Sequence, residues 1–135
     1  MVRVDRIELS EVRSDELTTA LRRWYQLCGA SGLYPREELG FGLLVGTREI
    51  MNGRACVIAT GTGNPLDFVI AFYGVDLKFY EGRSLVAHRF RDLPDRDVAE
   101  AAVTCYAEAV RRRRPLACRI VGDFGKQTID FEQVI

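Results

Sequence analysis

The sequence lacks the features that mark several large classes of protein. No uninterrupted apolar run approaches the ~20 residues that a membrane-spanning helix needs. Residues 1–15 alternate charged and apolar positions and contain no secretory hydrophobic segment, so we expect a cytoplasmic protein. Basic and acidic residues balance at 19 each, and this lack of a basic excess disfavours a dedicated nucleic-acid binder.

Motifs for metal and redox centres are also missing. The four cysteines, Cys28, Cys56, Cys105 and Cys118, are widely separated, and no two have C-x-x-C spacing. His88 is the single histidine, and one histidine without a cysteine pair does not complete a zinc site. Isolated cysteines in a reducing compartment behave as small hydrophobic residues, so we expect buried thiols and assign no metal. The sequence leaves any cofactor unknown.

What remains is the composition of one ordinary globular domain of 135 residues, 47% hydrophobic and 28% charged. Residues 2–9 alternate apolar and charged positions, which is typical of a strand, so we interpret residues 1–13 as an N-terminal arm or edge strand. A single domain over 14–135 then begins with a leading helix over 14–29, for which Ser14 is the expected N-cap. Four residues recur at helical spacing on one face of this helix: Leu17, Leu21, Trp24 and Cys28.

Two hairpins and a long helix are expected after the leading helix and a short helical segment over 36–44. Apolar runs over 55–60 and 67–75, joined by a Gly/Asn/Pro turn, predict the first hairpin. The period of two places Phe68, Ile70 and Phe72 on one face of its second strand.

The long helix is expected from Asp95 or Asp97 to about Arg114, where Pro115 stops it. A second hairpin follows over 116–121 and 128–135. This order predicts an α+β fold in which both hairpins form one concave antiparallel sheet. The helical crossover and the long helix cover one face of that sheet.

Four local patterns then resemble a known family. Trp24 lies in the leading helix (LRRWYQL), and the expected second strand ends in Phe68-x-Ile70-x-Phe72-Tyr73-Gly74. The next segment opens with Gly82-Arg83-Ser84-Leu85, and residues 102–115 form a helix that ends at a basic run and a proline. Over about residues 17–135 the chain thereby resembles a PAS domain, and most closely the alphaproteobacterial-type PAS family with an N-terminal helix.

The resemblance implies a stand-alone, non-catalytic sensory module that binds a ligand or another protein. The ligand would be a small apolar or aromatic molecule on the concave face, and the alternative is a core filled by the protein's own side chains. The candidate ligand-binding residues are Phe68, Ile70, Phe72, Tyr80, His88, Tyr106, Cys118 and Phe131.

A PAS sheet has five strands with the last one in the middle, whereas four strands are expected here. Three arrangements would account for the missing strand. The first and fourth strands pair directly, residues 2–9 add a strand in cis or from a partner, or the chain is truncated. The sequence does not choose among these three arrangements.

No kinase, cyclase or DNA-binding segment accompanies the domain, so such a sensor would signal by contact with another protein. We expect a homodimer through the leading helix, with Leu17, Leu21 and Trp24 at the interface. The signalling partner is unknown.

Two further interpretations stay open. One is a small α+β enzyme or a haem-binding sensor, in which His88 would supply the acid–base group or the iron ligand. The other is binding of an anionic partner by the basic run Arg111 to Arg114, although such a run at a helix C-terminus also complements the helix dipole.

Overall fold

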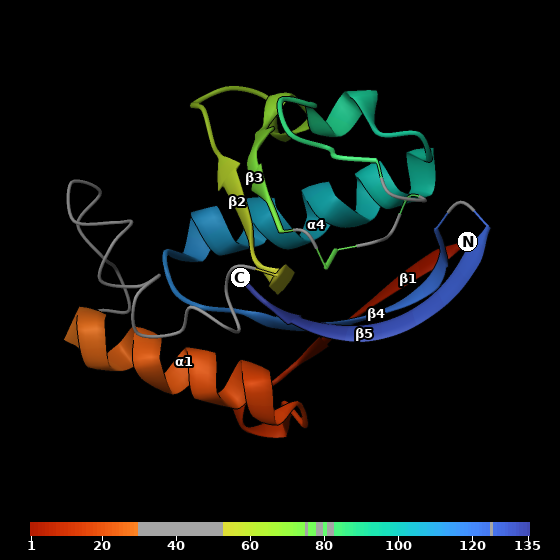
Figure 1. Ribbon diagram of the computed structural model, residues 1–135. Helices are drawn as coiled ribbons and strands as arrows, with labels where there is room; N and C mark the ends of the chain where they lie inside the picture. Colours follow the sequence, from red (N-terminus) through yellow and green to blue (C-terminus); the bar gives the residue numbers. More distant parts are fainter. Residues whose placement is uncertain (30–52, 75, 78–79, 81–82, 125) are drawn as a thin grey trace.

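A computed structural model describes residues 1–29, 53–74, 76–77, 80, 83–124 and 126–135 (Figure 1). The expected helix over 36–44 and Gly82 of the Gly-x-Ser-Leu pattern lie outside the described residues. In chain order the elements are β1 (Val2–Ile7), η1 (Leu9–Glu11), α1 (Asp15–Cys28), β2 (Cys56–Ala59), η4 (Pro65–Asp67), β3 (Val69–Tyr73), η5 (Phe90–Asp92), α4 (Arg96–Arg112), β4 (Ala117–Phe124) and β5 (Gln127–Val134). Helices and antiparallel sheets together confirm the predicted α+β class.

The larger sheet has three antiparallel strands in the order β1-β4-β5. The N-terminal segment is its edge strand, since Val2 pairs with Gly122 of β4 and Ile7 pairs with Ala117. β1 comes so close to β4 at this end that position 122 requires a glycine, because a Cβ there would lie 2.7 Å from the Cα of Val2. β1 therefore adds in cis, but beside β4 rather than between the two hairpins.

The two hairpins do not share a sheet within the described residues, so that prediction is wrong for them. β2 and β3 form a separate two-stranded sheet. The other side of β3 is occupied by a segment that follows Leu85: the Ile70 N–H donates to the His88 carbonyl at 2.9 Å, and the Phe90 N–H donates to the Phe68 carbonyl at 3.0 Å. Both sides of β4 are also filled, so among the described residues the open strand edges are those of β2, β5 and β1.

The larger sheet separates two helices (Figure 1). α4 and the β2–β3 hairpin lie on one side of it, and α1 lies on the other. Val98, Ala101 and Cys105 of α4 are buried, as its apolar stripe predicts. Arg113 ends α4 in the left-handed conformation with φ of 53°, two residues before Pro115. Neither described helix is long and apolar enough to span a bilayer.

α1 begins and ends as its sequence predicts. The Ser14 hydroxyl oxygen accepts a hydrogen bond from the Leu17 N–H at 3.3 Å, and Gly29 closes the helix with φ of 64°. The Arg13 and Ser14 N–H groups both donate to the Glu132 carboxylate on β5, at 2.9 and 3.0 Å. This carboxylate fixes the start of α1 on the sheet.

Candidate functional site

A buried cluster lies between the inner face of the larger sheet, α4 and the β2–β3 hairpin. The hydrophobic residues at its centre are Phe68, Ile70, Tyr80, Leu85, Phe90, Val98, Cys105, Cys118, Ile120 and Phe124. Of the candidate ligand-binding residues, Phe68, Ile70, Tyr80 and Cys118 belong to this centre, and Tyr106 and Phe131 pack against it partly buried. The sequence thus predicted six of these eight positions in one cluster.

Phe72 does not share that inner face, because β3 contains a β-bulge. Val57 pairs with Phe72, but the next residue, Ile58, pairs with Ile70, so Ala71 is an extra residue on β3. The extra residue shifts the alternation of the strand and leaves Phe72 39% exposed. The prediction that Phe72 lines the inner face is therefore wrong. Together with Val57, which is 43% exposed, it forms an apolar pair on the outer face.

His88 also lies apart from the cluster. Its side chain is exposed, on the segment that pairs with Ile70, and its Nδ1 lies 3.2 Å from the Val86 carbonyl oxygen. The prediction that His88 supplies a polar group to the buried lining is not met in this structure.

Aromatic rings fill much of the cluster themselves. The Phe90 ring lies 6.0 Å from Phe68 in an edge-on arrangement and 5.4 Å from Tyr106 in a tilted one, measured between centroids. Phe124 and Phe131 make a similar edge-on pair at 6.1 Å. Burial raises the pKa of Tyr106 well above its usual range. These contacts favour a core filled by its own side chains over an internal ligand pocket.

Three thiols lie near Tyr106: Cys56 of β2, Cys105 of α4 and Cys118 of β4. Cys105 and Cys118 form a hydrogen bond with one another, which raises the pKa of Cys105 and lowers that of Cys118; the charge of Arg6 adds to the latter effect. Burial raises the pKa of Cys56 to about 12. All four cysteines are free thiols, as the sequence predicts, but only Cys105 and Cys118 are fully buried. Among the described residues, no group of three or more candidate ligands is placed to hold a metal ion.

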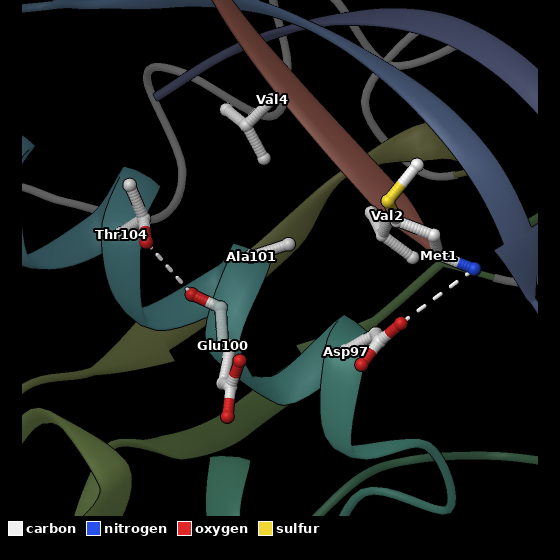
Figure 2. Close-up of a pocket in the computed structure, with 7 residues that line it drawn as sticks. All are labelled: Met1, Val2, Val4, Asp97, Glu100, Ala101 and Thr104. Carbon is white, nitrogen blue, oxygen red and sulfur yellow. Dashed lines mark hydrogen bonds and ion pairs between the residues drawn. The ribbon is translucent and has the colours of Figure 1, made fainter.

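A cavity of about 340 Å³ lies elsewhere, where β1 crosses α4 (Figure 2). It is lined by Met1, Val2, Val4, Asp97, Glu100, Ala101 and Thr104. The Met1 amine lies 3.6 Å from the Asp97 carboxylate, and the Thr104 hydroxyl donates to the Glu100 carbonyl oxygen at 2.8 Å. The sequence offered no signal for this cavity, because it depends on β1 and α4 meeting across the fold.

The apolar stripe of α1 points toward the rest of the protein. Leu17, Leu21 and Trp24 are partly buried, whereas the charged residues between them, such as Glu16 and Arg22, are exposed. The helix contacts β5. Part of the stripe predicted to form a dimer interface is therefore used within the chain.

Arg111 and Arg112 of the basic run at the end of α4 are paired internally. Glu108 accepts hydrogen bonds from Arg111 at 2.8 and 2.9 Å, from Arg112, and from Arg6 of β1 at 3.2 Å. The hydrogen bond from Arg111, followed by that from Arg112, lowers the pKa of Glu108 to about 2. This pairing leaves less uncompensated charge for an anionic partner.

Comparisons with known proteins found no matching family model, no matching curated protein and no matching solved structure.

Proposed function

We propose that the chain is a PAS-like, non-catalytic interaction module that works as a homodimer. The proposal keeps the sensory role that the sequence resemblance implies and favours contact with a protein over capture of a small ligand. The packing of the buried cluster argues against a small ligand, and the open edge of the larger sheet argues for a protein partner.

The buried cluster supports a role without catalysis. Burial raises the pKa of Tyr106 and Cys56, and the hydrogen bond with Cys118 raises the pKa of Cys105. Such groups remain protonated near neutral pH and are poor nucleophiles and bases in that form. The ring contacts of Phe90 with Phe68 and Tyr106 also occupy the space that a ligand would need.

The outer edge of β5 is the observation that carries the proposal. Leu116 and Ile135 exchange two backbone hydrogen bonds of 2.9 Å, which fixes the alternation along the β4–β5 pair. Every second residue of β5 consequently directs its N–H and C=O groups away from β4. These outward residues are Thr128, Asp130, Glu132 and Val134. No strand of the described residues pairs with them, and such an edge is a template for another strand.

Partly buried apolar side chains lie next to this edge. Ile129, Phe131 and Ile135 lie on the inner face and are only partly buried against the cluster. A strand added beside β5 would cover them as well as satisfy the backbone groups, so main-chain pairing and apolar burial would favour the same partner.

Native mass spectrometry of freshly purified protein tests the proposed function. We expect a homodimer without a stoichiometric small molecule. A monomer that carries one bound molecule per chain would overturn the proposal in favour of a ligand sensor.

The enzyme or haem alternative is tested by His88→Ala. Because His88 is exposed, we expect the variant to fold normally and to match the wild type in absorbance spectrum. A haem band that is present in the wild type and lost in the variant would establish His88 as an iron ligand instead.

A further inference from the structure

We propose that two copies of this chain pair antiparallel through the outward edges of their β5 strands, with Lys126 of each copy opposite Glu132 of the other. The inference deepens the proposed function, on which it rests, by naming the partner and the pairing register.

The edge of β5 is less protected than that of β1. Arg6 pairs with Glu108 of α4 and carries its charge on the inner face of β1, since it lies opposite Cys118 in the sheet register. A charge that points inward from an edge strand blocks pairing with another sheet. The inner face of β5 instead carries Ile129 and Phe131, with no charged residue at either position.

Charge complementarity and the length of the strand overlap together select the register of the pair. If Thr128 of one copy lies opposite Asp130 of the other, the outward backbone groups of both strands meet, and Lys126 lies opposite Glu132 at both ends. Centring the pair on Thr128 would also oppose Lys126 and an acidic residue, Asp130, but would leave Phe131 and Glu132 without an opposing β5 residue. Centring it on Asp130 would oppose two Asp130 carboxylates, and shifting it further would oppose Asp130 and Glu132. Like charges placed opposite one another destabilise a sheet. A shift by a single residue would bring the wrong backbone groups and faces together.

This register places the two-fold axis at Ile129. The two Ile129 residues then form a directly opposed, non-hydrogen-bonded pair whose Cα atoms are about 4.5 Å apart. Their side chains share the inner face with the two Phe131 rings, which are partly buried in the single chain. A two-fold axis also pairs both β5 edges at once and so closes the assembly at two copies.

Thr128→Pro and its control Thr128→Ala test the edge. Both variants lose the Thr128 hydroxyl bond of 2.7 Å to Asp123, but only proline removes the outward N–H. We expect Thr128→Pro to raise the dimer dissociation constant at least ~10-fold, because the two-fold symmetry removes two intermolecular hydrogen bonds. Thr128→Ala should remain dimeric in sedimentation velocity, with circular dichroism reporting the fold of each variant.

Ile129→Cys tests the register without weakening the edge. Under mild oxidation this variant should form a covalent dimer across the two-fold axis, because opposed residues in a non-hydrogen-bonded pair approach closely enough for a disulfide. Ile135→Cys, one residue beyond β5 on the same face of the sheet and away from the axis, should stay monomeric in non-reducing electrophoresis. Both variants are made in a Cys28→Ser, Cys56→Ser background to remove the two partly exposed native thiols.

The outcomes separate this inference from the function on which it rests. A monomeric wild-type protein overturns both the homodimer and the β5 interface. A dimeric wild type that is unchanged by Thr128→Pro and gives no Ile129→Cys crosslink overturns the interface alone. Dissociation of that dimer by Leu21→Asp with Trp24→Asp would then assign the contact to α1.

Discussion

Glu132 on β5 accepts a hydrogen bond of 3.0 Å from the backbone N–H of Ser14, although 118 residues separate the two in the sequence. The same carboxylate oxygen accepts the Arg13 N–H at 2.9 Å. Ser14 is the N-cap of α1, so one side chain of the sheet both orients the helix and neutralises part of its N-terminal dipole.

Replacing this carboxylate should loosen α1. We expect Glu132→Ala to lower the free energy of unfolding by about 1–2 kcal/mol, since two hydrogen bonds to a charged group are lost. Urea denaturation at one fixed protein concentration measures the change. Glu132→Gln, which keeps an acceptor oxygen, should recover much of it. Glu100→Ala, which removes only an exposed pair with Arg96, should cost no more than about 0.5 kcal/mol. Equal losses in Glu132→Ala and Glu100→Ala would contradict the anchoring role.

Because of the bulge in β3, replacing two phenylalanines that lie near each other in the sequence should lower the free energy of unfolding by very different amounts. Phe68 is 3% exposed and contacts the Phe90 ring, so Phe68→Ala should destabilise the protein by about 3–5 kcal/mol. Phe72→Ala should cost less than about 1 kcal/mol, because much of that side chain is already in water. Thermal or urea unfolding of the two variants provides the measurement. Similar losses would mean that Phe72 is buried after all.

Glu108 should contribute to the pH dependence of stability. Its pKa is lowered to about 2 in the folded protein from an ordinary value of 4.5, chiefly by the hydrogen bond from Arg111. The ionised carboxylate therefore stabilises the fold fully above about pH 4.5, and this contribution is lost as the pH falls toward 2. Glu108→Gln should flatten the fall in stability within that interval and change little at pH 7, where solvent screens the exposed pairs.

Urea titrations of the wild type and Glu108→Gln between pH 2 and 7 would measure this difference. The control Glu100→Gln removes a carboxylate that has one guanidinium partner, Arg96, instead of three. Parallel stability curves for wild type and Glu108→Gln across the acidic interval would rule out the linkage.

Thiol reactivity should report the buried cluster. Cys105 is 2% exposed and Cys118 is 1% exposed, so neither should react with a thiol reagent before the protein opens. Cys28 and Cys56 are partly exposed, and Cys56 should be the slower of the two because burial raises its pKa to about 12. Pulsed alkylation followed by peptide mass spectrometry gives the order of modification. Early modification of Cys118 in the native protein would contradict its burial in the cluster.

Local chemistry explains which elements the sequence predicted. Ser14 and Gly29 bound α1, Pro115 follows α4, and the period of two along β4 identifies Cys118 and Ile120 as inward residues. Each of these signals acts over a few residues, where side-chain size and backbone preference decide the outcome. The buried centre of the candidate site was predictable for the same reason.

Long-range pairing explains what the sequence did not predict. The position of β1 beside β4 depends on the close approach of Val2 to Gly122, and no local pattern specifies that partner. The same holds for Glu132, whose role depends on a helix that starts more than a hundred residues earlier. No sequence pattern marks the bulge at Ala71 either, because its neighbours continue the apolar run without a glycine.

Ala71 gives the hairpin a tolerance for a change in length that substitutions alone would not disclose. Since one surplus residue sets the phase of everything after it on β3, a deletion at that point would restore strict alternation. Phe72 would then follow Ile70 directly and stay on the outer face, and Tyr73 would stay on the inner face, because strict alternation assigns them to those faces. Loss of a single codon at Ala71 would thus regularise the strand while the other side chains of β3 kept the faces that they occupy now.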